Sequence, residues 1–175
     1  MIDQVEDAIK KAFQKLRGRD GDLFECPVEE NAHYDSRKLH EVCINHKLAN
    51  YLEEYLFSEI DNLKEIFITD IEFNREGVNF KSLQYDGQEN RVRPDIIIHN
   101  RRSGAEKINF LVVECKKDSA THEEKAKDIK KIEAFLTDNR YEYEFGLQAV
   151  YSKHGITGRL FFKKNGQISH RDINE

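Results

Sequence analysis

The sequence predicts a single α/β domain in which a mixed central β-sheet is flanked by helices. The chain of 175 residues is long enough for one compact core. Two helical segments come first, several strand segments follow, and one more helix separates these strands from the last ones. A helix between strands is typical of the crossover that joins two parallel strands. We expect one domain over residues 1–175, with an N-terminal helix over 1–18 and a core over 36–163.

The helical segments are recognised by apolar residues that recur every three or four positions. The first pattern runs from Ile2 to Leu16 and ends near Gly18. A second helix is expected to begin at about Ser36, a residue type that caps helix N-termini well. A third helix is expected over 121–138, with one apolar face and one lysine-bearing face. Solvation is the expected role of those lysines.

The strand segments are rich in β-branched and aromatic residues and are separated by turn residues. The two strongest are VRPDIIIHNR and INFLVVECKK. Weaker strand patterns precede them in IFITDIEFNR and VNFKSLQY, and others follow in YEFGLQAVYS and GRLFFKKNGQIS. The last of these contains Asn165-Gly166, a residue pair typical of a hairpin turn.

Composition and charge limit the classes of function. No run of about 18 apolar residues and no signal-peptide pattern is present, so we expect a cytoplasmic protein without membrane contact. Cys26, Cys43 and Cys115 are odd in number and form no CxxC pair, which argues against a disulfide framework and a thiolate zinc site. A net charge of −5 argues against nonspecific coating of nucleic acid.

The net charge hides an asymmetry between the two halves of the chain. Residues 1–88 hold 11 Lys+Arg against 19 Asp+Glu, whereas residues 89–175 hold 17 against 14. The first half therefore has a net charge of −8 and the second half +3. Any surface that faces phosphate groups should come mostly from the second half.

Charged residues stand at the ends of the two strongest strand segments. In the sequence ECK, Glu114 and Lys116 are two positions apart and so point to one face of a strand. Asp95 precedes three isoleucines on the other strand. If the strands pair, the two carboxylates come together, and a hard divalent cation would relieve their repulsion. The structural alternative is that both acids simply end their strands and Lys116 pairs with one of them.

The combined pattern resembles the PD-(D/E)XK nuclease superfamily. It consists of RPD before the isoleucines, an apolar strand that ends in ExK about twenty residues later, and a lysine-bearing helix after it. The segments HEVCINHKLANYLEEYL and DIEFNR are also similar to uncharacterised phage and bacterial proteins with restriction endonuclease-like folds. This similarity spans roughly residues 39–150. It implies a restriction endonuclease-like core of element order αβββαβ.

The resemblance also implies a division of roles in the site. Asp95 and Glu114 would bind the catalytic Mg²⁺, for which Mn²⁺ can substitute, and Cys115 would add its backbone carbonyl. Lys116 would orient or activate the attacking water. Many superfamily members add an acid from the helix before the sheet, and Glu41 is the candidate for this fourth catalytic and metal-binding position. A solvated glutamate near a helix start is an equal alternative for Glu41.

Cations near the motif are candidate contacts to nucleic acid. Arg91, Arg93, Arg101 and Lys117 lie close in sequence to Asp95 or to the ExK motif. Positive side chains suit a phosphodiester substrate, although arginine and lysine are also ordinary solvated residues.

Three further residues have open roles. Asp70 and Glu72 are expected on one strand face, where solvated or structural use is favoured over a role as a further metal ligand or as ion-pair partners of Arg75. His99 has the same strand parity as Asp95 and could join the site.

The sequence therefore predicts an Mg²⁺-dependent PD-(D/E)XK nuclease that hydrolyses phosphodiester bonds of nucleic acid, with DNA as the expected polymer. The expected partners are nucleic acid and, beyond it, a second copy or a larger assembly. One alternative is a catalytically silent, nuclease-like module that binds nucleic acid or protein. Another is a subunit of a restriction, repair or phage-defence assembly.

Overall fold

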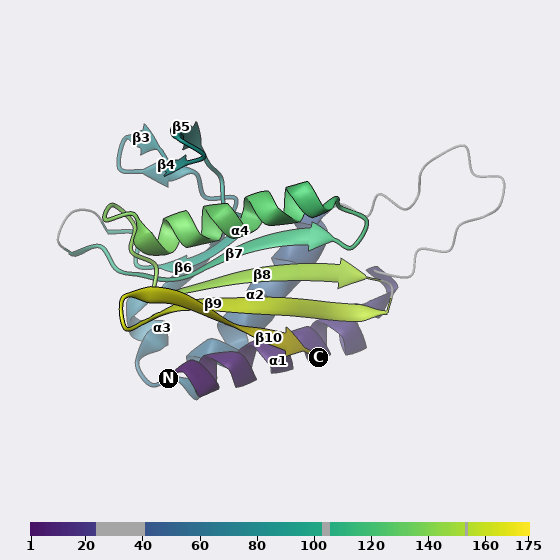
Figure 1. The fold of residues 1–175 in the computed structure, drawn as a ribbon. Coiled ribbons are helices and arrows are strands. Elements are labelled where there is room, and N and C mark those ends of the chain that lie inside the picture. The colour runs from purple at the N-terminus through teal and green to yellow at the C-terminus, as the bar shows by residue number, and fades with distance from the viewer. Residues whose placement is uncertain (24–40, 103–105, 153) are drawn as a thin grey trace.

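The computed structural model describes residues 1–23, 41–102, 106–152 and 154–175 (Figure 1). The helices are α1 (Ile2–Arg19), the short η1 (Gly21–Leu23), α2 (Glu41–Glu59), α3 (Leu63–Ile66) and α4 (His122–Thr137). The strands are β1 (Ile68–Ile71), β2 (Arg75–Glu76), β3 (Asn79–Phe80), β4 (Ser82–Tyr85), β5 (Gln88–Arg91), β6 (Ile96–His99), β7 (Asn109–Lys117), β8 (Phe145–Ser152), β9 (Gly155–Lys164) and β10 (Gln167–Asn174).

The main sheet has six strands in the order β1-β6-β7-β8-β9-β10. β7 and β8 are parallel and are joined through α4, whereas every other neighbouring pair in this sheet is antiparallel. Helices α1 and α2 cover one face of the sheet and α4 lies on the other (Figure 1). The prediction of a mixed sheet flanked by helices is therefore confirmed.

Alternation along β7 sorts its side chains between the two faces. Leu111, Val113 and Cys115 belong to the core under α1 and α2, and Val112 belongs to the core under α4. Because successive strand residues point to opposite faces, Glu114 has the same direction as Val112 and faces α4. The charged end of the strand is thus placed beneath a helix.

Helix α4 begins at a complete capping box. Thr121 Oγ1 accepts from the backbone N–H of Glu124 at 3.2 Å, and a Glu124 carboxylate oxygen accepts from the Thr121 N–H at 2.8 Å. The helix packs closely on β8, where a Cβ atom on Gly146 would lie 2.3 Å from Ile132 Cγ2. The helix predicted over 121–138 is confirmed, and Gly146 permits its close approach to the sheet.

The segment between β1 and β6 differs from the prediction. β1 ends at Ile71 because Glu72 has a φ of +51°, which extended strand does not allow. The following residues form two small separate ladders, β2-β3 and β4-β5, outside the main sheet. The expectation that Asp70 and Glu72 share a strand face is therefore wrong.

The two ends of the chain follow their predictions more closely. α1 corresponds to the N-terminal helix, and its buried face consists of Val5, Ala8, Ile9, Ala12, Phe13 and Leu16. The hairpin turn at Asn165-Gly166 is confirmed, with φ of +52° and +79° at these two residues. The predicted start of the second helix at Ser36 lies outside the described residues, within which α2 begins at Glu41.

No helix in the described parts of the chain combines the length and apolar character that a bilayer crossing requires.

Candidate active site

Asp95 and Glu114 stand opposite each other at one end of the β6–β7 pair. Ile96 pairs with Val113, so the antiparallel register sets the preceding Asp95 against Glu114. Asp95 Oδ2 accepts a hydrogen bond of 2.7 Å from the backbone N–H of Cys115. The structure therefore brings together the two acids that the sequence predicted as metal ligands.

Glu114 is buried, with a relative exposure of 1%. Its Oε2 lies 2.5 Å from Lys131 Nζ, whereas its Oε1 is buried without a hydrogen-bond partner in the described part of the chain. Burial raises the pKa of Glu114 to about 8, and the Lys131 ammonium opposes this rise. A buried carboxylate oxygen without a partner is costly, so this atom is a candidate for binding a cation.

Helix α4 contributes two further residues, which the sequence motif does not include. Asp128 is 2% exposed, with Lys131 Nζ 2.9 Å from its Oδ1 and Lys116 Nζ 3.2 Å from its Oδ2. Lys131 thus bridges Asp128 and Glu114, and its expected role as a solvated lysine is wrong. A signal was present in the sequence, because Asp128 lies at helical spacing from the apolar Ile132 and Phe135.

The cluster contains three carboxyl groups and two ammonium groups. Burial raises the pKa of Asp95, although the Cys115 N–H and the Lys116 ammonium oppose this effect. Burial acts to lower the pKa of Lys131, but the Glu114 and Asp128 carboxylates outweigh it and raise the pKa. The lysines therefore remain charged, and the carboxyl groups outnumber them.

The donor atoms suit a hard divalent cation of the magnesium class, which prefers carboxylate and carbonyl oxygens. Asp95 and Glu114 supply two such groups, and Oε1 of Glu114 is buried without a hydrogen-bond partner among the described residues. Within the described residues, no three His, Cys, Asp or Glu side chains are gathered closely enough to form a complete ligand set. Further ligands would have to come from the Cys115 carbonyl or Glu41. Glu41 begins α2, but its side chain is outside the described atoms.

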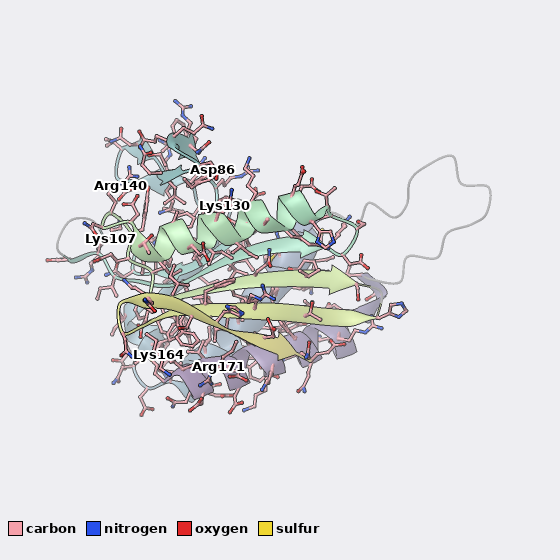
Figure 2. The ribbon with its side chains drawn as sticks, in the orientation of Figure 1. Asp86, Lys107, Lys130, Arg140, Lys164 and Arg171 are labelled. Atoms are coloured by element: carbon pink, nitrogen blue, oxygen red, sulfur yellow. The ribbon has the colours of Figure 1, made fainter. Side chains whose placement is uncertain are left out.

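The β4–β5 hairpin packs against α4 next to this cluster. Leu83 of β4 belongs to the core under α4, and Tyr85 at the end of β4 lies near the charges of Lys131 and Glu114. Asp86 in the hairpin turn pairs with Lys130 of α4 at 2.5 Å (Figure 2). Burial raises the pKa of the Tyr85 hydroxyl.

The four cations predicted to contact nucleic acid have different surroundings. The guanidinium of the exposed Arg91 lies 5.0 Å from the Phe80 ring centroid, and the exposed Arg93 lies 3.4 Å from Glu72. Arg101 is hydrogen-bonded to Asp70, and Lys117 is half-buried at the end of β7. Arg91 and Arg93 immediately precede Asp95, whereas Arg101 lies beyond the far end of β6.

His99 is also at the far end of β6. Its Nε2 lies 2.8 Å from Asp70 Oδ2, and the same carboxylate accepts from Arg101 Nε at 2.7 Å. Asp70 therefore pairs with His99 and Arg101, and the expected pairing with Arg75 is not the one in the structure. Strand β6 separates this group from Asp95.

Comparison with known proteins gave no match to any protein-family model, curated protein or solved structure.

Proposed function

We propose that this chain is a metal-dependent nuclease of the PD-(D/E)XK type, with a restriction endonuclease-like core. The observation that carries the proposal is the Glu114 carboxylate, which is buried opposite Asp95 with one oxygen unpartnered among the described residues. The succession α2, β1, β6, β7, α4 and β8 supports it, because this is the αβββαβ order expected of such a core. The ExK lysine lies in the same cluster.

Asp95 and Glu114 would hold the metal ion, with the Cys115 carbonyl and Glu41 as further candidate ligands. When bound, a magnesium ion would lower the pKa of a coordinated water and stabilise the developing charge on a phosphate group. The Asp95 carboxylate is also held in position, since the hydrogen bond that it accepts from the Cys115 N–H fixes it against β7.

Lys116 would act as a charged hydrogen-bond donor to the attacking water or to a phosphate oxygen. Burial acts to lower its pKa, but Asp128 and Asp95 outweigh this effect and raise the pKa. A lysine with a raised pKa keeps its proton at neutral pH, so it would orient the nucleophile and would not accept a proton from it. Asp128 is then a positioning residue, because it holds both Lys116 and Lys131.

DNA is the polymer that the resemblance favours. Arg91 and Arg93 are exposed on the chain that leads into Asp95, where they could contact the phosphate backbone. Arg101 is hydrogen-bonded to Asp70 and lies at the opposite end of β6. It is therefore a weaker candidate for contact with the substrate strand that Arg91 and Arg93 could bind.

A second candidate function is a catalytically silent module that binds nucleic acid or protein. It is favoured by the position of Lys131, whose ammonium already neutralises part of the Glu114 carboxylate at 2.5 Å. Titration of the protein with Mn²⁺ separates the two candidates. The nuclease must bind the ion and lose this binding in Glu114→Gln, whereas a silent module has no need of it.

The direct test is cleavage of supercoiled plasmid and single-stranded DNA with Mg²⁺ or Mn²⁺. Asp95→Asn and Lys116→Met should each lower the rate about 100-fold or more, because each removes a charge next to the reacting phosphate. Lys130→Met is the matched control, since Lys130 lies on α4 but pairs with the half-exposed Asp86. Equal cleavage by all four proteins would overturn the assignment of the site.

A further inference from the structure

A second group of charged residues surrounds a cavity of 210 Å³ at the end of β6 away from Asp95. Six basic side chains line it, and they come from four separate stretches of the chain: Arg75, Lys81, His99, Arg101, Arg102 and Lys107. Lys107 marks this end of the molecule in Figure 2, near Arg140 and the end of α4. The cavity shares no lining residue with the carboxylate cluster described above.

Lys81 is the central feature of the cavity. It lies just before β4 and is only 3% exposed, yet its ammonium has no hydrogen-bond or ion-pair partner among the described residues. Its Nζ lies 5.4 Å from the Phe73 ring centroid and 5.3 Å from that of Tyr141, which are weak substitutes for a counter-ion. Buried ammonium groups are ordinarily paired, so the bare Nζ indicates that the partner is a ligand.

The other cations of the cavity do not use all their hydrogen-bond donors. Lys107 Nζ donates to Glu76 and to the Arg140 carbonyl, which leaves one of its three N–H groups. Arg101 uses Nε and one terminal nitrogen on Asp70, so further guanidinium N–H groups remain. Donors from several directions therefore surround the cavity.

The local charge is positive. Among the residues described here, three carboxylates pair with the cavity's cations: Asp70 with Arg101, Glu76 with Lys107 and Glu106 with Arg102. Lys81 and Arg75 have no carboxylate partner within the described chain. Burial lowers the pKa of Lys81 to about 8; the neighbouring Lys107 adds to this effect, and the nearby Glu76 and Asp70 oppose it without outweighing it.

We propose that this cavity is a binding site for a compact oxyanion of the phosphate class, with Lys81 as its central ligand. The size of the cavity limits the buried part of the ligand to one such group with a small substituent. Lysine binds phosphate as a point charge, and the arginines add directed N–H donors. The phosphate belongs either to a small molecule or to the end of a polynucleotide. The site does not depend on the proposed nuclease activity.

The test uses the full chain in phosphate-free buffer, titrated with inorganic phosphate and, separately, with sodium chloride at matched ionic strength. Phosphate should raise the melting temperature of the wild type beyond the effect of chloride. Lys81→Met should weaken phosphate binding by about tenfold or more, because it removes a buried charged donor. Lys130→Met, an exposed lysine outside the cavity, should leave binding unchanged.

A second measurement does not require a variant to fold. Amide chemical shifts of the wild type should move on phosphate addition at Lys81, His99 and Lys107, and not around Glu114. Equal stabilisation by phosphate and chloride would overturn the proposal, and so would unchanged phosphate binding in Lys81→Met.

Two further probes distinguish the sources of the phosphate group. Ribose 5-phosphate is compared with ribose, and a 5′-phosphorylated oligonucleotide is compared with its 5′-hydroxyl form, both without divalent metal. Preference for the phosphorylated member in the first pair alone assigns the site to small phosphate esters. Preference in the second pair assigns it to polynucleotide ends. Absence of preference in both pairs would contradict a phosphate-class site.

Discussion

The two ends of strand β6 each have a buried charged group without a full set of partners, and these two groups have opposite sign. At the end before Ile96, the buried Glu114 has one oxygen without a partner among the described residues, in a cluster where carboxyl groups outnumber lysines. At the other end, the buried Lys81 has no carboxylate within ion-pair distance in the described chain, in a cavity where basic side chains predominate. One strand thus separates a site suited to a cation from a site suited to an anion.

The contribution of a buried lysine to stability depends on its partners and not on its burial alone. Lys131 and Lys81 are both largely buried. Lys131 contacts two carboxylates, whereas Lys81 contacts two aromatic rings. Removing the Lys131 ammonium should leave a buried acid unpaired and so destabilise the fold. Removing the Lys81 ammonium should eliminate an unpaired buried cation and so stabilise it.

The largest expected effect is therefore that of Lys131→Met. It should lower the free energy of unfolding by about 3–5 kcal/mol at pH 8, because the buried Glu114 and Asp128 both lose the ammonium that bridges them. The folded-state pKa of Glu114 is raised from 4.5 to about 8, so its contribution to stability is favourable below pH 4.5 and is lost as the pH rises towards 8. The variant should consequently be less impaired at pH 5. Urea unfolding at both pH values measures this, and equal losses at both would contradict it.

The packing of α4 on the sheet should matter most to metal binding at the carboxylate end of β6, because Asp128 and Lys131 lie on this helix. Gly146→Ala would place a Cβ atom 2.3 Å from Ile132 Cγ2 and should cost about 2–3 kcal/mol of stability. Displacement of α4 also moves Asp128 and Lys131, so Mn²⁺ binding should weaken.

Gly158→Ala is the matched control for this substitution. Its Cβ atom would meet the Phe13 ring at 2.9 Å on the opposite face of the sheet. It should lower the melting temperature but leave Mn²⁺ affinity unchanged. Equal loss of Mn²⁺ affinity in both glycine variants would show that the effect comes from general destabilisation.

Lys81→Met should change the free energy of unfolding in the opposite direction to Lys131→Met. The folded-state pKa of Lys81 is lowered from 10.5 to about 8, so the unfavourable burial of its charge is present in full below pH 8 and disappears above 10.5. In phosphate-free buffer at pH 7 the variant should be more stable than the wild type by about 1–2 kcal/mol, and the gain should shrink at pH 10. Denaturant titrations at both pH values test this. A loss of stability at pH 7 would show that Lys81 has a partner.

The smallest effect on stability is expected at an ion pair that is exposed to solvent. Asp86→Asn removes the ion pair with Lys130, but the two side chains are 49% and 53% exposed. We expect a loss below about 0.5 kcal/mol that disappears in high salt. Melting curves at two salt concentrations measure it. A larger loss would mean that this pair, and not the packing of Leu83, holds the β4–β5 hairpin on α4.

Much of the fold was predictable because its signals are local. The apolar alternation of β7, the capping box at Thr121 and the turn at Asn165-Gly166 depend on residues close together in the chain. The positive φ at Glu72 was not predictable from the strand pattern, because the β-branched and aromatic residues around it favour extended structure. The ends of β1 and the small ladders after it depend on tertiary contacts with residues far away in the sequence.

The candidate site, like the fold, was predictable only where its signals are local in the sequence. Asp95, Glu114 and Lys116 belong to a motif whose spacing along two strands is visible in the sequence, and the register sets the two acids opposite each other. Asp128 and Lys131 were not assigned, because a charged pair on an amphipathic helix ordinarily faces solvent. Their role depends on which face of α4 rests on β7.

By itself, the sequence determined the alternation of helices and strands, the mixed sheet, and the strand ends on which the two acids and the ExK lysine stand. Only the tertiary structure decided which lysines are partnered and which are not. Lys131 and Lys81 each lie in stretches that read as ordinary amphipathic elements. This is because the energy of a buried charge is set by groups far away in the chain, and the apolar periodicity of a segment does not indicate which groups these are.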